Sequence, residues 1–175
     1  DVSNASQLVS QKLSRFSASK LPNRMPYGDF SGQLIDVLRV IGSETAIPVM
    51  HVQHGSFDTH DGQKWQHPRL LEELANGLSA FRKNLIKMGR WDDVLVLTYS
   101  EFGRRVAENG AKGTDHGAAS VQFVMGGKVN AGLYGDYPSL DKLKDGDLVY
   151  TMDYRSVYEH ICSCWLNQKN NEWQT

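Results

Sequence analysis

The segment from Val94 to Gly117 constrains the fold more than any other part of this 175-residue chain. Its first six residues, Val94 to Tyr99, are apolar or favour β-structure, and they run directly into the polar sequence Ser-Glu-Phe-Gly-Arg-Arg. This pattern predicts a buried strand that ends abruptly in charged residues. Because ligands of open α/β sheets bind beyond the carboxyl ends of the strands, we expect Glu101, Arg104 and Arg105 to lie at a functional edge.

Two other polar clusters stand beside predicted strands. Residues 54–60, His-Gly-Ser-Phe-Asp-Thr-His, follow the β-rich run 47–53. Residues 114–117, Thr-Asp-His-Gly, precede the apolar run 121–125 and are predicted to be a loop that returns to the same edge. The sequence therefore predicts three polar clusters at one rim.

The connection between the first two predicted strands is a helix. Apolar side chains recur at steps of three and four from Pro68 to Met88, with proline at the start and a glycine after the end. A strand, an amphipathic helix and a strand in this order predict that 47–53 and 94–99 are parallel. We therefore expect the side chains of His60 and Glu101 to converge at the shared edge of the sheet.

The remaining elements complete an α/β pattern. In order along the chain we predict a peripheral helix in 1–20, a proline-containing linker in 21–27, a helix from Asp29 or Ser31 to Gly42, a surface excursion in 126–146 and a helix in 153–166. The expected organisation is a peripheral helix and linker over 1–26, followed by an α/β domain with a largely parallel sheet over 27–175.

Composition excludes several classes of partner. The 19 Lys and Arg residues nearly balance the 20 Asp and Glu residues and form no long run, so the charge pattern gives no sign of a nucleic-acid-binding surface. No stretch approaches the roughly 18 consecutive apolar residues of a membrane span. Cys162 and Cys164 stand two apart in a predicted helix, so their side chains should diverge and a disulfide between them is not expected.

The three polar clusters contain side chains that suit a divalent metal. The candidate ligands are carboxylates and imidazoles, namely Asp58, His60, Glu101, Asp115 and His116. A mixed oxygen and nitrogen set favours zinc or manganese, with one or two ions. Each carboxylate also has a structural interpretation, because an aspartate can hold a turn or cap a loop and a glutamate can occupy the first turn of a helix.

The other histidines and the arginines are interpreted separately. We expect His51, His67 and His160 to be structural, and His54 to be an outer member of the site. Arg104 is the candidate for binding an anionic substrate group, because a guanidinium pairs bidentately with phosphate or sulfate oxygens. The alternative is that Arg104 and Arg105 are solvated surface residues.

Several motifs together resemble the domain of unknown function 1501 family of bacterial proteins. They are GSFDTHDGQ at 55–63, LTYSEFGRR at 97–105, GTDHGAAS at 113–120, GLYGDYPSL at 132–140 and TMDYRSVY at 151–158. The resemblance covers about residues 27–166. That family is grouped with the alkaline phosphatase and sulfatase superfamily and is commonly exported with a twin-arginine signal, so the resemblance implies a periplasmic or exported protein.

The resemblance also implies a fold and a site. It implies a three-layer α/β/α sandwich with a two-metal hydrolase centre, whose ligands would fall on Asp58 with His60, on Glu101 with Phe102, and on His116. The sequence departs from this pattern, because Asp58 and His60 are two residues apart instead of four and Phe102 replaces an imidazole. No nucleophile follows a predicted strand before Asp29. We therefore expect the C-terminal part of an alkaline-phosphatase-like domain, incomplete in itself.

Two functions follow as expectations. The first is metal-dependent hydrolysis of a phosphate or sulfate ester, with a small-molecule or saccharide ester as substrate and the nucleophile outside this chain. The alternative is a non-catalytic metal-binding or scaffolding protein that retains the superfamily core. An incomplete sheet would expose an apolar face, so we also expect this chain to form a homodimer or to aggregate.

Overall fold

The computed structural model describes residues 10–14 and 16–166, and the chain divides into two compact units. The first unit contains the described residues up to Thr98, together with Asn109–Gly113 and Phe123–Val129. The second unit contains Tyr99–Glu108, Thr114–Gln122 and the described residues from Asn130 onward. Residues 10–14 are helical within the predicted helix 1–20, while residues 1–9 and 15 lie outside the described part.

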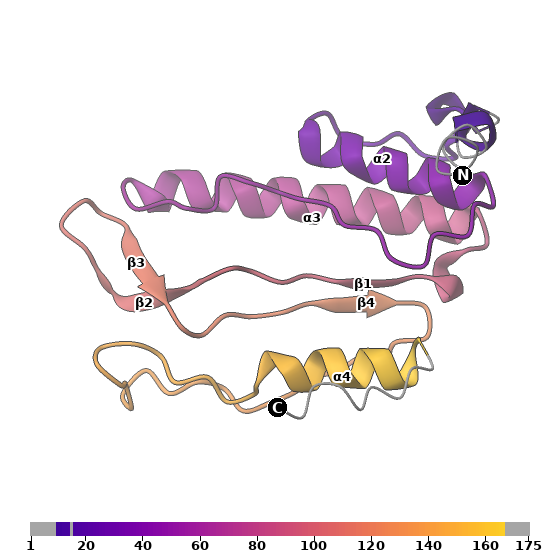
Figure 1. The fold of residues 1–175 in the computed structure, drawn as a ribbon. Helices are drawn as coiled ribbons and strands as arrows, with labels where there is room; N and C mark the ends of the chain where they lie inside the picture. Colours follow the sequence, from indigo (N-terminus) through magenta and orange to yellow (C-terminus); the bar gives the residue numbers. More distant parts are fainter. Residues whose placement is uncertain (1–9, 15, 167–175) are drawn as a thin grey trace. The chain divides into compact units, whose positions relative to one another are not determined.

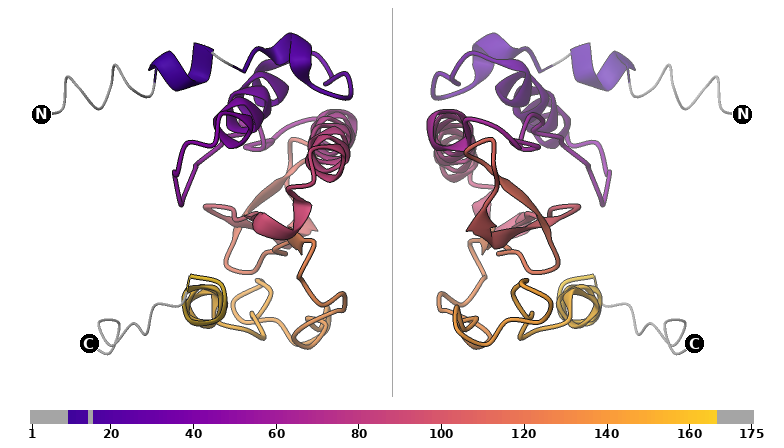
Figure 2. Two further views of the ribbon diagram at one scale, coloured as in Figure 1. Left: turned by 90° about the vertical axis from the view of Figure 1, so that its right-hand side faces the viewer. Right: turned by 90° about the vertical axis from the view of Figure 1, so that its left-hand side faces the viewer.

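Two helices build the core of the first unit. Helices α2 (Asp29–Gly42) and α3 (Gln63–Lys87) lie side by side, as Figure 1 shows along their length and Figure 2 shows nearly end-on. A Cβ atom at Gly77 of α3 would lie 2.7 Å from the ring of Phe30, so this glycine permits the close approach of the two helices. The buried apolar side chains are Met25, Leu34, Leu38, Ile41, Phe81 and Leu85.

Both predicted helices are confirmed, with differences at their ends. Helix α2 begins at Asp29 but has Gly28 as its N-cap, and α3 begins five residues before Pro68 with Gly62 as its N-cap. Helix α3 ends at Lys87, one residue before the predicted end at Met88, and Gly89 beyond it has a positive φ of 69°. The amide of Arg90 donates to the Leu85 carbonyl oxygen (2.8 Å), and that of Gly89 donates to Ile86 (3.0 Å), which is the hydrogen-bond pattern of a Schellman cap.

A short antiparallel ribbon covers the helix pair of the first unit. Strand β1 (Leu95–Leu97) pairs with β4 (Val124–Gly126), with Val96 opposite Met125. Val94, which precedes β1 in an extended conformation, and Val96 within β1 both pack against the helical core, as expected for alternate side chains of extended backbone. The 3-10 helix η2 (Trp91–Asp93) leads from α3 into β1, and another, η1 (Ala18–Lys20), precedes α2.

The predicted strand at 47–53 does not form, so the parallel strand pair was wrong. The side chain of Gln33 in α2 forms hydrogen bonds with both backbone groups of Gln53. It donates to the carbonyl oxygen (2.8 Å) and accepts from the amide (2.9 Å). Met50 and Val52 nevertheless pack against the core, so the segment is irregular and partly buried. Its apolar residues serve helix packing instead of a sheet.

The second unit consists of a hairpin, a long irregular segment and a helix. Strand β2 (Gly103–Glu108) pairs antiparallel with β3 (Thr114–Gly117), so the predicted loop at 114–117 is a strand. Helix α4 (Tyr154–Cys164) lies within the predicted range 153–166. The half-buried residues of this helix and its C-cap are Val157, Tyr158, Ile161, Cys162 and Trp165. The predicted surface excursion in 126–146 is confirmed, since from residue 127 onward it contains only one isolated β-bridge, between Lys144 and Asp147.

The three-layer α/β/α sandwich with a largely parallel sheet is therefore wrong for the part of the chain that the structure describes. The strands form two separate two-stranded sheets, both antiparallel. The prediction that His60 and Glu101 converge at the edge of a parallel sheet depended on such a sheet, and the described residues do not form one. None of the described helices is both long and apolar enough to cross a membrane.

Candidate functional site

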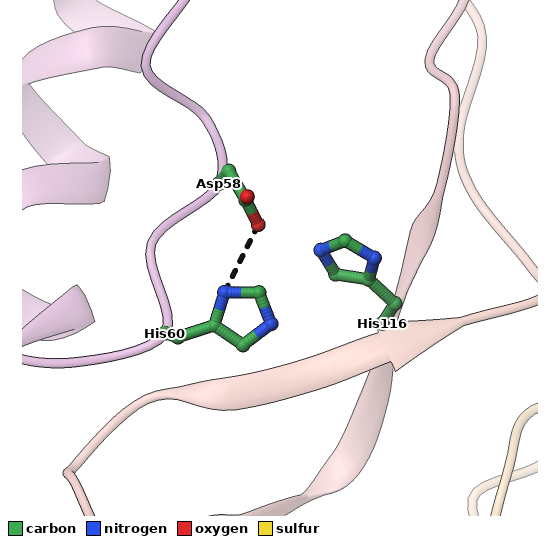
Figure 3. A group of neighbouring side chains, drawn as sticks. All are labelled: Asp58, His60 and His116. Carbon is green, nitrogen blue, oxygen red and sulfur yellow. Dashed lines mark ion pairs between the residues drawn. The ribbon is translucent and has the colours of Figure 1, made fainter.

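The segment before α3 presents Asp58 and His60 together. The Oδ1 atom of Asp58 lies 3.0 Å from Nδ1 of His60, the ion pair drawn as a dashed line in Figure 3. Their side chains are 62% and 46% exposed. Thr59 between them is buried, and its Oγ1 accepts a hydrogen bond from Gln63 in the first turn of α3. The inward Thr59 thus holds the segment while its two neighbours turn outward.

This pairing sets the chemistry of the His60 ring. A carboxylate at Nδ1 favours the tautomer with the proton on Nδ1, which places the lone pair of the neutral imidazole on Nε2. Histidine ligands of metals commonly have this arrangement, in which a carboxylate orients the ring and raises the basicity of the ligating nitrogen. Asp58 can therefore act as a ligand or as the group that orients His60.

A turn from the β2–β3 hairpin is hydrogen bonded to the His60 segment within the first unit. Asn109 Nδ2 donates to the His60 carbonyl oxygen (3.0 Å), and the amides of Gly62 and Gln63 donate to Ala111 (3.1 Å) and Lys112 (3.2 Å). The Asn109 Oδ1 atom also accepts from the amides of Ala111 and Gly113, which fixes the turn internally. The backbone on both sides of His60 is thus held in place.

In the second unit, His116 is held by an aromatic face. The rings of Phe102 and His116 are stacked, with centroids 3.7 Å apart and planes inclined by 6°. The Arg104 guanidinium lies 5.1 Å from the centroid of the Phe102 ring and donates a hydrogen bond to the Thr114 carbonyl oxygen. Arg104 and His116 are cross-strand partners, so their side chains leave the same face of the hairpin.

The end of β3 is fixed by Asp147. Its Oδ2 atom accepts from the Ala118 amide (2.8 Å), and its Oδ1 atom accepts from the Leu148 amide (2.7 Å). A Cβ atom at Gly117 would lie 2.6 Å from Asp147 Oδ1, so only glycine fits directly after His116. The sequence Thr-Asp-His-Gly therefore has a structural requirement at its last position.

The other predicted site residues have different surroundings. Asp115 precedes His116 on β3, and because side chains alternate along a strand, the two point to opposite faces. Glu101 is exposed in the connection between β1 and β2. Arg105 alternates with Arg104 on β2, and its Nη1 atom lies 3.5 Å from the Asp145 carbonyl oxygen. Arg104 and Arg105 are thus not a pair facing one ligand.

His54, predicted as an outer member of the site, is packed among aromatic side chains. Its ring stacks on Phe30 with a centroid distance of 4.8 Å and meets the edge of Phe57 at 5.0 Å. Its Nε2 atom lies 3.1 Å from the Leu70 carbonyl oxygen. Phe57 also contacts the ring of His67, so these two histidines line one aromatic cluster beneath the Asp58 segment.

Sequence reasoning did not identify the three residues that hold the candidate histidines. Phe102 was interpreted as a missing ligand, whereas it stacks on His116. Asn109 and Gly113 were not singled out, although they hold the turn beside His60. The dipeptide Asn109-Gly110 was the available signal, because asparagine and glycine are favoured in turns.

Figure 3 draws Asp58 and His60 of the first unit and His116 of the second, and each of these side chains offers one atom that can bind a metal ion. The chain belongs to the family described as Protein of unknown function (DUF1501), which matches residues 10–160. No curated protein and no solved structure shows significant similarity to the chain. Family membership thus agrees with the expected resemblance, and it assigns no activity.

Proposed function

We propose that the protein binds a divalent metal ion through Asp58, His60 and His116. The observation that carries this proposal is the Asp58–His60 pair, a carboxylate and an imidazole that are both exposed and whose Oδ1 and Nδ1 atoms lie 3.0 Å apart. One carboxylate and two imidazoles are a ligand set that zinc accepts readily, and manganese is the second choice. Water or substrate would complete the coordination, since a site with three protein ligands retains an open position.

Chain connectivity supports the inclusion of His116. The turn 109–113 is hydrogen bonded to the His60 carbonyl oxygen, and His116 follows Gly113 by three residues. Three extended residues span at most about 10 Å, so the covalent chain allows His116 to reach the His60 segment. Asp115 is left out of the proposed set because it leaves the opposite face of β3.

A second candidate function adds chemistry to this site. Arg104 leaves the same face of the hairpin as His116, which favours an anionic substrate group beside the metal ligands. A bound divalent ion would polarise a phosphate or sulfate oxygen or lower the pKa of a bound water. If the protein is a hydrolase, Arg104 binds and orients the anionic group of the substrate. A non-catalytic metal-binding protein would use the same metal site but would not turn over an ester.

Elemental analysis and calorimetry test metal binding directly. We expect purified protein, stripped with a chelator and titrated with zinc or manganese, to bind one equivalent at this site, and we expect Asp58→Asn, His60→Gln and His116→Gln each to weaken the binding of that equivalent at least tenfold. His51→Gln is the matched control, because it removes an imidazole of the first unit outside the proposed set. Unchanged affinity in His60→Gln would exclude the site.

Turnover of aryl phosphate and aryl sulfate esters separates the two functions. The hydrolase predicts metal-dependent turnover that falls in Arg104→Gln with metal affinity retained. Metal binding without turnover of either ester supports the non-catalytic alternative.

A further inference from the structure

A second cluster of metal-ligating side chains lies on α4, in the second unit. His160 and Cys164 are four residues apart on this helix, which places them on the same face, one turn apart. The Cys164 Sγ atom lies 3.7 Å from His160 Nδ1, and both residues are exposed. None of the proposed ligands Asp58, His60 and His116 belongs to this helix.

The distance between the two donor atoms matches a tetrahedral zinc site. Zinc binds thiolate sulfur at about 2.3 Å and imidazole nitrogen at about 2.05 Å, so a tetrahedral angle places sulfur and nitrogen about 3.6 Å apart. The observed separation of 3.7 Å therefore requires almost no rearrangement for both atoms to bind one ion. Sulfur and imidazole ligands together select zinc over the hard cations magnesium and calcium.

The position on the helix also favours a cation. Cys164 is the last residue of α4, and the C-terminal end of a helix carries partial negative charge from carbonyl groups that lack helical partners. This field disfavours an isolated thiolate but favours a bound divalent ion. A zinc ion at this end would thus be stabilised by the helix as well as by its two ligands.

Cys162 is not part of the cluster and serves as an internal control. Two residues along a helix correspond to a rotation of about 200°, so Cys162 leaves the face opposite to Cys164. Cys162 is half-buried, whereas Cys164 is exposed. The chain therefore contains one thiol inside the cluster and one outside it, on the same helix.

We propose that His160 and Cys164 bind a zinc ion at the C-terminal end of α4, with its other coordination positions open to water or to a further ligand. This site is separate from the one proposed for Asp58, His60 and His116, which contains no thiol. Its signature is therefore a metal-dependent change at one identified cysteine.

Site-resolved alkylation tests this proposal. The full chain is treated with iodoacetamide with and without zinc, and modification of each cysteine is followed by mass spectrometry. We expect zinc to slow alkylation of Cys164 several-fold and to leave Cys162 unchanged, and we expect His160→Gln to abolish this protection. Protection should persist in His116→Gln, so loss of the first site and loss of this one are distinguishable.

Cadmium titration gives an independent measurement, because a bound thiolate produces an ultraviolet charge-transfer band. The band should be retained in Cys162→Ser and lost in Cys164→Ser. Since both side chains of the cluster are exposed, circular dichroism of the variants should match that of the parent chain. Equal zinc protection in the parent and in His160→Gln, or a band that survives Cys164→Ser, would overturn the proposal, as would absence of both signals in the folded chain.

Discussion

A Cβ atom at Gly113 would overlap the backbone carbonyl of His60, so Gly113 allows the turn 109–113 to reach the backbone of a candidate metal ligand. Asn109 donates to the same carbonyl oxygen at 3.0 Å. The two contacts fix the His60 segment through its main chain, which leaves its imidazole to be positioned by Asp58.

Replacing Gly113 should therefore destabilise this contact. We expect Gly113→Ala to lower the free energy of unfolding by about 1–3 kcal/mol, because the added methyl group forces the turn away from the His60 backbone. Urea denaturation measures the change. Gly110→Ala is the matched control, since a Cβ atom there would meet nothing within 4 Å. Equal stability of the two variants would show that the turn does not need this close approach.

The stacking of Phe102 on His116 predicts a spectroscopic effect. A ring face 3.7 Å away shifts the imidazole proton resonances of His116 upfield, so Phe102→Leu should move them downfield toward random-coil values. Phe57→Leu is the control, because Phe57 contacts His54 and His67 and should change their resonances instead. Resonances of His116 that stay in place in Phe102→Leu would contradict the stacked arrangement.

Asn84 predicts a stability effect in the core of the first unit. The fully buried side chain of Asn84 accepts a hydrogen bond from the backbone amide of Asn23 (2.9 Å) and donates one to the Ala80 carbonyl oxygen (3.0 Å). It thus connects the linker before α2 to helix α3. We expect Asn84→Ala to cost roughly 1–3 kcal/mol in unfolding free energy, because it leaves a backbone amide without its acceptor. Asn76→Ala, at an exposed position of the same helix, should be nearly neutral or slightly stabilising.

The N-terminus of α4 predicts a pH dependence. Hydrogen bonds from Arg155 lower the pKa of Asp153, the N-cap, to about 2 from its ordinary value of 3.8. A lowered pKa in the folded state stabilises the helix above about pH 4, and this contribution disappears as the pH falls toward 2. Asp153→Asn retains a capping side chain but cannot titrate.

Thermal unfolding of both chains at pH 5 and pH 2 measures this effect. The parent chain should unfold at the higher temperature at pH 5, and the difference between the two chains should shrink at pH 2. A difference that is the same at both pH values would show that the Asp153 carboxylate contributes nothing through its charge.

The helices were predictable because their cores repeat at the helical period. Phe81 and Leu85, both in the predicted stripe of α3, are among the most buried residues of the chain. The position of Gly89 also followed from sequence, because a helix that ends in a left-handed residue favours glycine there. Local periodicity and local capping chemistry thus determined these elements.

The sheets were not predictable from the same reasoning, because pairing depends on contacts distant in sequence. Segment 47–53 has strand-like composition. However, the side-chain amide of Gln33 is hydrogen bonded to both backbone groups of Gln53, and Pro48 has no backbone N–H to donate to a neighbouring strand. Strand β1 pairs instead with β4, in an antiparallel register. Hydrophobic runs alone do not distinguish a buried strand from an extended segment against helices.

The candidate site was partly visible in the sequence. Asp58, His60 and His116 were expected from residue type, and Asp58 with His60 does form a close pair. The alternation that separates Asp115 from His116 could not be inferred while 114–117 was interpreted as a loop. Phe102 was interpreted only as a residue that cannot bind a metal, whereas in the structure its ring stacks on the imidazole of His116.

The division of the chain into two units has a consequence for dissection of the protein. The chain passes from one unit to the other after Thr98, Glu108, Gly113, Gln122 and Val129. No single cut therefore releases either unit whole. A truncation at Thr98 would remove the β4 partner of β1 and the turn that bonds to Gly62 and Gln63. Attempts to express the two units as separate halves should yield unfolded polypeptide, and proteolytic nicks within 99–129 should leave fragments that stay associated.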